Sequence, residues 1–204
     1  MLRPMILVGL TGGVATGKST VARMFQQCGA IVVSADVLAR EVVRPGRSAW
    51  REIVTEFGRS ILKPDRTIDR QGLGDIVFRN PRKRRKLERI VHPRVARLQA
   101  RLTRQAAKQN RHAVVVYEVP LLFEAGVDKR VDRIVVVTAP RSTQIARLKT
   151  RDGLPRNESL RRIDSQLPMD QKVARADAVL NGAAPLPVLR AEVRKLYRQF
   201  QRLA

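Results

Sequence analysis

Residues 6–20 constrain this chain more than any other stretch, because an apolar run passes there into a glycine-rich turn that ends in Gly-Lys-Ser at 17–19. From Gly12 the order is G-x-x-x-x-G-K-S, the phosphate-binding P-loop pattern. Residues 6–10 are apolar and of strand length, which favours a buried strand. Glycines let the backbone aim successive N–H groups at an anion, and the helix that begins near Lys18 adds its positive N-terminal end. We therefore predict a strand–loop–helix unit that binds a nucleoside triphosphate.

Two side chains of the loop have separate expected tasks. Lys18 is expected to reach the β- and γ-phosphates, and the Ser19 hydroxyl is expected to bind Mg²⁺. The competing interpretation is a glycine-rich turn with a chance Gly-Lys-Ser, which the preceding strand and following helix disfavour. The residues expected to bind the phosphates are Gly12, Gly13, Val14, Ala15, Thr16, Gly17, Lys18, Ser19 and Thr20.

The composition is that of a globular protein with one unusual property. A chain of 204 residues suits a single domain, its longest apolar runs are of strand length, and one cysteine excludes an internal disulfide. The N-terminal segment lacks a secretory pattern, so we expect a cytoplasmic protein. The unusual property is the charge: 41 Lys and Arg against 18 Asp and Glu give a net charge of +23, which favours anionic ligands.

The positive charge is concentrated between Arg79 and Arg111, where 13 basic residues face a single acidic one. There the arginines recur at helical spacing beside an apolar stripe, so they form either the solvated flank of an amphipathic helix or a docking strip for phosphates or nucleic acid. Aromatic residues that could stack bases are nearly absent, which disfavours specific single-strand binding. We expect nucleic-acid binding through 79–111 to be non-specific at most.

The second predicted strand, 30–34, runs directly into Asp36. A carboxylate at the carboxyl end of a strand beside a P-loop lies where open α/β sheets bind ligands, so Asp36 is a helix cap, a substrate-facing group, or both. The third strand begins only at 113, and the intervening residues predict an inserted helical lobe for an acceptor substrate. Its expected helices are 37–43, 48–57, 69–79, 81–91 and 93–110, with Asp69 and Asn80 as caps.

The remaining strands are expected at 113–119, 131–139 and 178–180, with a final helix over 186–203. Glu118, at the end of the third strand, resembles the second carboxylate by which P-loop enzymes hold Mg²⁺ or its water. Between the last two strands, expected helices at 141–151 and 158–166, the second capped by Asn157, flank a Gly-Leu-Pro break and carry arginines. They predict a mobile lid that brings Arg147 and Arg151 to the triphosphate.

These features together indicate a small-molecule kinase. Phosphoryl transfer needs cations on the nucleotide, expected from Lys18 and Arg151, and a group that takes the acceptor's proton, expected to be Asp36. A regulatory GTPase would carry a guanine-reading Asn-Lys-x-Asp, which the chain lacks.

Motifs in the same order along nearly the whole chain resemble the dephospho-CoA kinase family. They are Leu10–Thr20, Ser34-Ala35-Asp36 with Ala39-Arg40-Glu41, Ile68-Asp69-Arg70, His92-Pro93, Pro120-Leu121-Leu122-Phe123-Glu124, Arg147-Leu148-x-x-Arg151 with Gln166, and Asn181. Two departures are Glu118, where the family usually has Asp, and Asn181-Gly182-Ala183 in place of Asn-x-Gly.

The resemblance implies transfer of the γ-phosphoryl group of ATP to the ribose 3′-hydroxyl of dephospho-CoA, with Mg²⁺ and with Asp36 as base. It implies a three-layer P-loop α/β fold with a five-stranded parallel sheet. That fold would comprise a core (1–36, 112–140, 176–204), an acceptor lobe (37–111) and a lid (141–175). The further residues implied are Arg147, Arg151 and Asn181 for ATP, Ser19 and Glu118 for the metal, and Thr11, Asp36, Arg40, His92, Leu121 and Glu124 for the acceptor.

Two other functions stay open on the sequence. The charge of +23 fits an ATP-dependent nucleic-acid-binding P-loop protein. A kinase of another small metabolite on the same scaffold would differ only in its acceptor lobe.

Overall fold

A computed structural model describes residues 5–204. These residues form two compact units, one made of 5–34 with 103–204 and the other of 35–102. Within the described part of the chain, no helix has the length and apolar character needed to cross a membrane.

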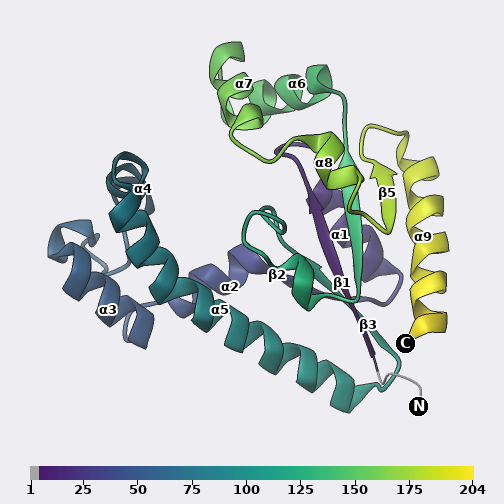
Figure 1. The fold of residues 1–204 in the computed structure, drawn as a ribbon, viewed down its shortest axis with the longest axis horizontal. Coiled ribbons are helices and arrows are strands. Elements are labelled where there is room, and N and C mark those ends of the chain that lie inside the picture. Colours follow the sequence, from purple (N-terminus) through teal and green to yellow (C-terminus); the bar gives the residue numbers. More distant parts are fainter. Residues whose placement is uncertain (1–4) are drawn as a thin grey trace. The chain divides into compact units, whose positions relative to one another are not determined.

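The first unit contains a five-stranded, all-parallel sheet with the order β2-β3-β1-β4-β5 (Figure 1). The predicted α/β fold class is therefore confirmed, and each strand end lies within two residues of its expected position. The strands are β1 (Met5–Gly12), β2 (Ile31–Ser34), β3 (Ala113–Glu118), β4 (Arg133–Thr138) and β5 (Ala178–Asn181). Their Val- and Ile-rich sequences suit strands that are buried on both faces.

One face of the sheet is covered by α1 (Lys18–Gln27) and α9 (Leu186–Leu203). Alternate residues of β1 point to this face, and Val8 and Leu10 are fully buried there. Between the two helices the rings of Phe25 and Phe200 stack with centroids 6.3 Å apart. This packing holds the first residues of α1 at the carboxyl end of β1.

Three helices and a 3₁₀ turn complete the first unit: 3₁₀ turn Asp128–Arg130, α6 (Arg141–Asp152), α7 (Arg156–Asp164) and α8 (Met169–Val173). The expectation that Asn157 caps α7 is wrong. The helix begins at Arg156, two residues earlier than expected, and its N-cap is Pro155, whose extended backbone starts the turn without a side-chain cap. The short α8 was not predicted, because five residues are too few to show helical periodicity.

The second unit contains α2 (Ala35–Val42), α3 (Ser48–Phe57), a 3₁₀ turn (Arg59–Ile61), α4 (Arg70–Arg79) and most of α5 (Pro81–Gln109). Its core is small and apolar, formed by Ile53, Ile61, Ile68 and Leu73. The predicted cap of α4 is confirmed, since the Asp69 carboxylate accepts the backbone N–H of Gln71 at 3.1 Å.

The two helices expected on either side of residue 92 are one continuous helix, α5, with Pro93 inside it. Pro93 cannot donate to the carbonyl four residues earlier, which normally ends or kinks a helix. Here Leu87, Ile90 and Val91 stay packed against the apolar core of the second unit. The Arg94 guanidinium also donates to the Ile90 carbonyl at 2.7 Å. Packing against the core of the second unit outweighs the local effect of the proline.

Candidate active site

The turn between β1 and α1 has the backbone conformation that the P-loop pattern requires. Ala15 (φ 58°) and Gly17 (φ 98°) both lie in the left-handed region, which turns the chain sharply around the carboxyl end of β1. Gly17 is the N-cap of α1 and supplies no side-chain acceptor to the first turn. The positive end of α1 is thus left to be capped by a ligand, and an anion is the favoured one.

Lys18, Ser19 and Glu118 lie together beside this loop. The Ser19 hydroxyl donates to the Glu118 carboxylate at 2.9 Å, and the Lys18 ammonium lies 4.0 Å from the same oxygen. The contact follows from strand register, because β1 and β3 run parallel with Leu10 opposite Glu118. A hydroxyl, a carboxylate and an ammonium group therefore converge where the phosphates of a nucleotide would lie.

Three side chains from the segment after β4 bind the backbone of the loop. Arg147 donates to the carbonyls of Ala15 (3.1 Å) and Gly182 (2.8 Å). Gln144 donates to the Val14 carbonyl at 2.8 Å, and Gln166 accepts the Val14 N–H at 2.8 Å. One of these Arg147 donors thus supports the loop and the other the segment after β5; because Arg147 also lines the pocket over the loop, its contact with ATP stays a prediction. Gln144 was not among the expected site residues, and Gln166 was noted only in the family motif, because neither contact follows from a local pattern.

We expect the double substitution Gln144→Leu and Gln166→Leu to raise the KM for ATP by about tenfold or more. It leaves both backbone groups of the half-buried Val14 without their side-chain partners, and each unsatisfied group costs about 1–3 kcal/mol when water does not replace the partner. The measurement is steady-state kinetics with varied ATP, and Gln105→Leu, an exposed glutamine on α5, is the matched control. An unchanged KM in the double variant would show that the loop keeps its shape without these bonds.

A pocket of about 970 Å³ opens over the loop, large enough for a nucleotide. Its lining includes Gly13, residues 15–20, Arg23, Thr143, Ala146, Arg147, Thr150, Arg151, Gly182, 184–186 and Leu189. Arg151 lines it as expected and forms an ion pair with Asp152 at 2.8 Å; their hydrogen bond raises the pKa of Arg151. Asn181 does not line it, since its side chain accepts the N–H of Ala183.

Gly182, one residue beyond the expected Asn181, makes the contact with the P-loop. A Cβ built on Gly182 would lie 2.0 Å from the Thr16 carbonyl oxygen, a distance that no side chain tolerates. The departure from the Asn-x-Gly pattern thus places a glycine where two backbones meet.

The residues that follow β3 are held by the segment beyond α7. The Glu124 carboxylate accepts the Leu167 N–H at 3.0 Å and lies 2.8 Å from the ammonium of Lys172, which is fully buried. Burial opposes ionisation of Glu124, but the bonds from Lys172 and Leu167 outweigh it and lower the pKa. Of the other residues expected to bind the acceptor here, Leu121 is exposed, whereas Thr11 is buried and donates to the Pro120 carbonyl at 3.2 Å.

The Glu124–Lys172 pair predicts a pH-dependent stability. The pKa of Glu124 is lower in the folded state than its ordinary value of 4.5. The ionised carboxylate therefore stabilises the folded protein at pH values above 4.5, and this stabilisation is lost as the pH falls through the folded-state pKa. Glu124→Gln leaves Lys172 charged and buried, and should cost about 2 kcal/mol at pH 7, less than a fully buried pair because Glu124 still reaches water.

Denaturant unfolding of Glu124→Gln at a series of pH values measures this contribution. The difference in free energy of unfolding between Glu124→Gln and wild type should become smaller as the pH falls below 4.5, because Glu124 of the wild type is then protonated and neutral as well. The matched double variant Glu124→Gln with Lys172→Met should recover most of the loss, because it removes the buried charge. A difference that stays constant with pH would contradict the ionic origin.

In the second unit, Asp36 lies in the first turn of α2, one residue after the helix start. The Asp36 side chain is exposed and lies near two arginines, Arg40 and Arg70. The pKa of Arg70 is lowered, mainly by burial and also by the positive charge of Arg40. The negative charge of Asp36 raises that pKa and so opposes the other two effects. Within residues 35–102, Arg40 and Arg70 form no ion pair. Arg70 belongs to the Ile-Asp-Arg motif but is not among the site residues predicted from the sequence. His92, which is among them, lies exposed on α5.

Three features define this protein as a P-loop kinase. They are the P-loop after β1, the Glu118 carboxylate at the end of the adjacent parallel strand, and the arginine-bearing helices after β4. The family model described as dephospho-CoA kinase matches residues 6–187. A dephospho-CoA kinase from Geobacter metallireducens is 50% identical over 196 residues, which cover 96% of each chain. The chain belongs to the dephospho-CoA kinase family.

Solved structures agree with this assignment. A Thermus thermophilus protein superposes with a TM-score of 0.81 at 32% identity, covering 95% of this chain and 97% of that one. The dephospho-CoA kinase from Campylobacter jejuni superposes with a TM-score of 0.73 at 26% identity, covering 97% and 98%.

Proposed function

We propose that the protein transfers the γ-phosphoryl group of ATP to the ribose 3′-hydroxyl of dephospho-CoA, the final step of coenzyme A synthesis. The observation that carries the proposal is the convergence at the P-loop of Lys18 and Ser19 on one oxygen of Glu118, at 4.0 Å and 2.9 Å, in a chain of this family. Lys18 neutralises the β- and γ-phosphates, and the first turn of α1 binds them through backbone N–H groups.

Ser19 and Glu118 fit a magnesium ion. Mg²⁺ prefers oxygen ligands and in kinases needs one or two protein groups besides the phosphates, so the hydroxyl–carboxylate pair 2.9 Å apart suffices. Among residues 5–204 no cluster of three metal-binding side chains exists, and none is required for this kind of site. When bound, the ion would neutralise charge on the triphosphate.

We assign the acceptor to the second unit. Asp36 takes the proton of the 3′-hydroxyl as it attacks, while Arg40 and Arg70, which form no ion pair within residues 35–102, bind the diphosphate of dephospho-CoA. The expected division into core, acceptor lobe and lid is part of this proposal. Arg151 supplies a further cation to the transferring group when the lid segment 141–175 closes.

A coupled assay of ADP release tests the acceptor. Dephospho-CoA should support turnover, and adenosine, AMP and other nucleosides or nucleotides should support little, because they lack the diphosphate–pantetheine portion. Equal rates with another acceptor would indicate a kinase of a different metabolite on this scaffold.

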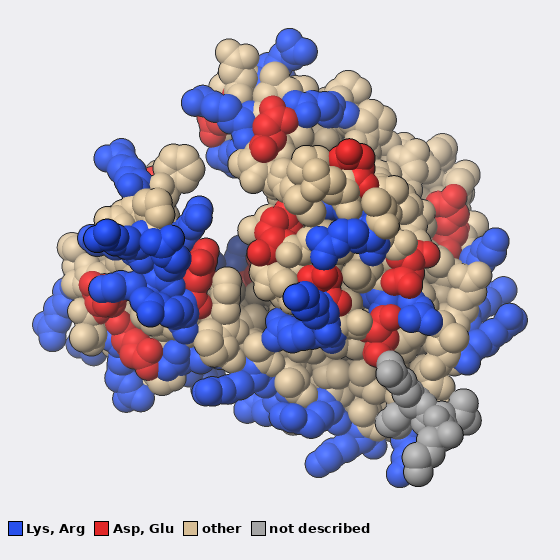
Figure 2. All heavy atoms as spheres, in the orientation of Figure 1, with Lys and Arg blue, Asp and Glu red and all other residues tan. Residues whose placement is uncertain are grey.

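The basic stretch of α5 is the observation behind the nucleic-acid alternative. Lys and Arg side chains outnumber Asp and Glu along this helix (Figure 2). Because the surface offers charge without stacking aromatics, binding to RNA should be weak and lost with modest added salt. Tight binding at physiological salt that stimulates ATP hydrolysis would instead support the alternative.

A further inference from the structure

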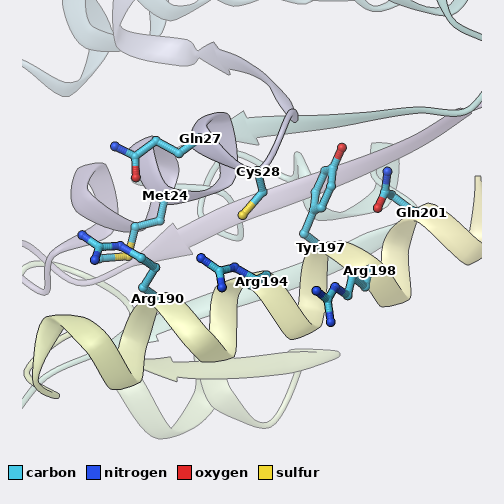
Figure 3. Close-up of a pocket in the computed structure, with 8 residues that line it drawn as sticks. All are labelled: Met24, Gln27, Cys28, Arg190, Arg194, Tyr197, Arg198 and Gln201. Atoms are coloured by element: carbon cyan, nitrogen blue, oxygen red, sulfur yellow. The ribbon is translucent and has the colours of Figure 1, made fainter.

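A second, smaller pocket lies between α1 and α9 in the first unit. Its volume is about 270 Å³. Figure 3 shows its walls: Met24 and Gln27 from α1, Cys28 directly after α1, and Arg190, Arg194, Tyr197, Arg198 and Gln201 from α9. None of these residues lines the nucleotide pocket, so both pockets can be occupied at once.

Three arginines of this pocket form a row along α9. Arg190, Arg194 and Arg198 are four residues apart, which places them on one helix face at intervals of about 6 Å. Within residues 5–204, none of the three has an ion-pair or hydrogen-bond partner, whereas Arg133, Arg141 and Arg175 elsewhere in this unit are paired with aspartates. Three adjacent cations without a carboxylate repel one another, and an anion between them would relieve that repulsion.

The rest of the lining suits an anion of limited size. In Figure 3 the Arg190 and Arg194 guanidinium groups extend toward α1, beside Met24 and Cys28. Burial, with a smaller effect of Cys28, raises the pKa of Tyr197, so its hydroxyl stays protonated at neutral pH and can donate. Gln27 and Gln201, whose side-chain amides can also donate, complete the polar lining. No acidic side chain lines the pocket.

We propose that this pocket binds one or two phosphate groups of a small molecule, independently of the nucleotide site. Guanidinium groups bind phosphate through paired, charge-assisted hydrogen bonds, which single lysines do not reproduce. A volume of 270 Å³ holds phosphate or diphosphate but is small for a whole nucleotide, for which the 970 Å³ pocket is available. A concave site with Tyr197 as its single aromatic residue also favours a small anion over a nucleic-acid strand.

Calorimetric titration with inorganic pyrophosphate tests the site on the kinase saturated with Mg²⁺, a non-hydrolysable ATP analogue and dephospho-CoA, so that both substrate sites are occupied. We expect one pyrophosphate to bind per protein chain. The triple substitution Arg190→Gln, Arg194→Gln and Arg198→Gln should lower the affinity for pyrophosphate at least tenfold. The matched control removes equal charge from α5 through Arg97→Gln, Arg101→Gln and Arg104→Gln, and should change affinity less than twofold. All six side chains are exposed, so folding should be preserved.

Cys28, the only cysteine of the chain, provides a readout inside the pocket. Pyrophosphate should slow alkylation of Cys28 by iodoacetamide in the analogue-saturated kinase, with a saturable dependence that the triple variant loses. Absence of binding, or equal weakening by the α5 control, would overturn the proposal. The proposal would also be overturned if RNA bound more tightly than pyrophosphate and the α9 substitutions abolished that RNA binding. This result would indicate a surface for polyanions.

Discussion

Asp36→Asn is expected to lower kcat on dephospho-CoA by ~10²–10⁴, the usual contribution of a general base. The amide keeps the size of the side chain but accepts no proton at neutral pH. The KM for ATP should change little, because Asp36 does not line the nucleotide pocket. Steady-state assays with each substrate varied in turn separate the two parameters.

The matched control is Asp75→Asn, an exposed aspartate on α4 in the same unit. It removes the same charge and should leave kcat within twofold of wild type. If Asp36→Asn behaves like this control, another group takes the proton and the assignment of Asp36 is wrong, while the family assignment stands.

Lys18→Ala is expected to lower kcat by ~10²–10³, comparable with the loss of one preorganised group that stabilises transition-state charge. Its ammonium lies 4.0 Å from Glu118 at the phosphate end of the pocket, so truncation also leaves that carboxylate without its nearest cation. ATP binding, measured by calorimetry, should weaken less than kcat falls, because the N–H groups of α1 still bind the phosphates.

Lys129→Ala removes an exposed lysine from the 3₁₀ turn before β4 and serves as the control. It should leave turnover unchanged. Near-normal turnover of Lys18→Ala would mean that the P-loop lysine does not stabilise the transferring group in this protein.

Much of the fold could be predicted because its signals are local. The strands are short runs of Val and Ile, and a P-loop binds phosphate through contiguous backbone groups, so both are visible in neighbouring residues. The caps at Asp69 and Asn80 are confirmed for the same reason: each carboxylate or amide oxygen accepts an N–H two residues ahead.

The errors occurred where tertiary packing outweighed a local rule. Pro93 should end a helix, yet α5 continues through it because the apolar residues before the proline stay packed. A further contact was not predicted but contradicts no prediction: the Glu124 carboxylate, expected to bind the acceptor, forms an ion pair with the buried Lys172. The role of Glu124 in substrate binding stays a prediction.

The sequence by itself determined the phosphate loop, the parallel sheet and the family, since these depend on motifs and periodicity within short windows. Only the tertiary structure decided how the loop is supported. The loop residues Val14, Ala15 and Thr16 are contacted by four residues that are distant in sequence: Gln144, Arg147, Gln166 and Gly182. The largest of these sequence separations is 152 residues. Such contacts leave no repeating pattern, because the hydrogen bonds form only after the strands have set the register that brings these segments together.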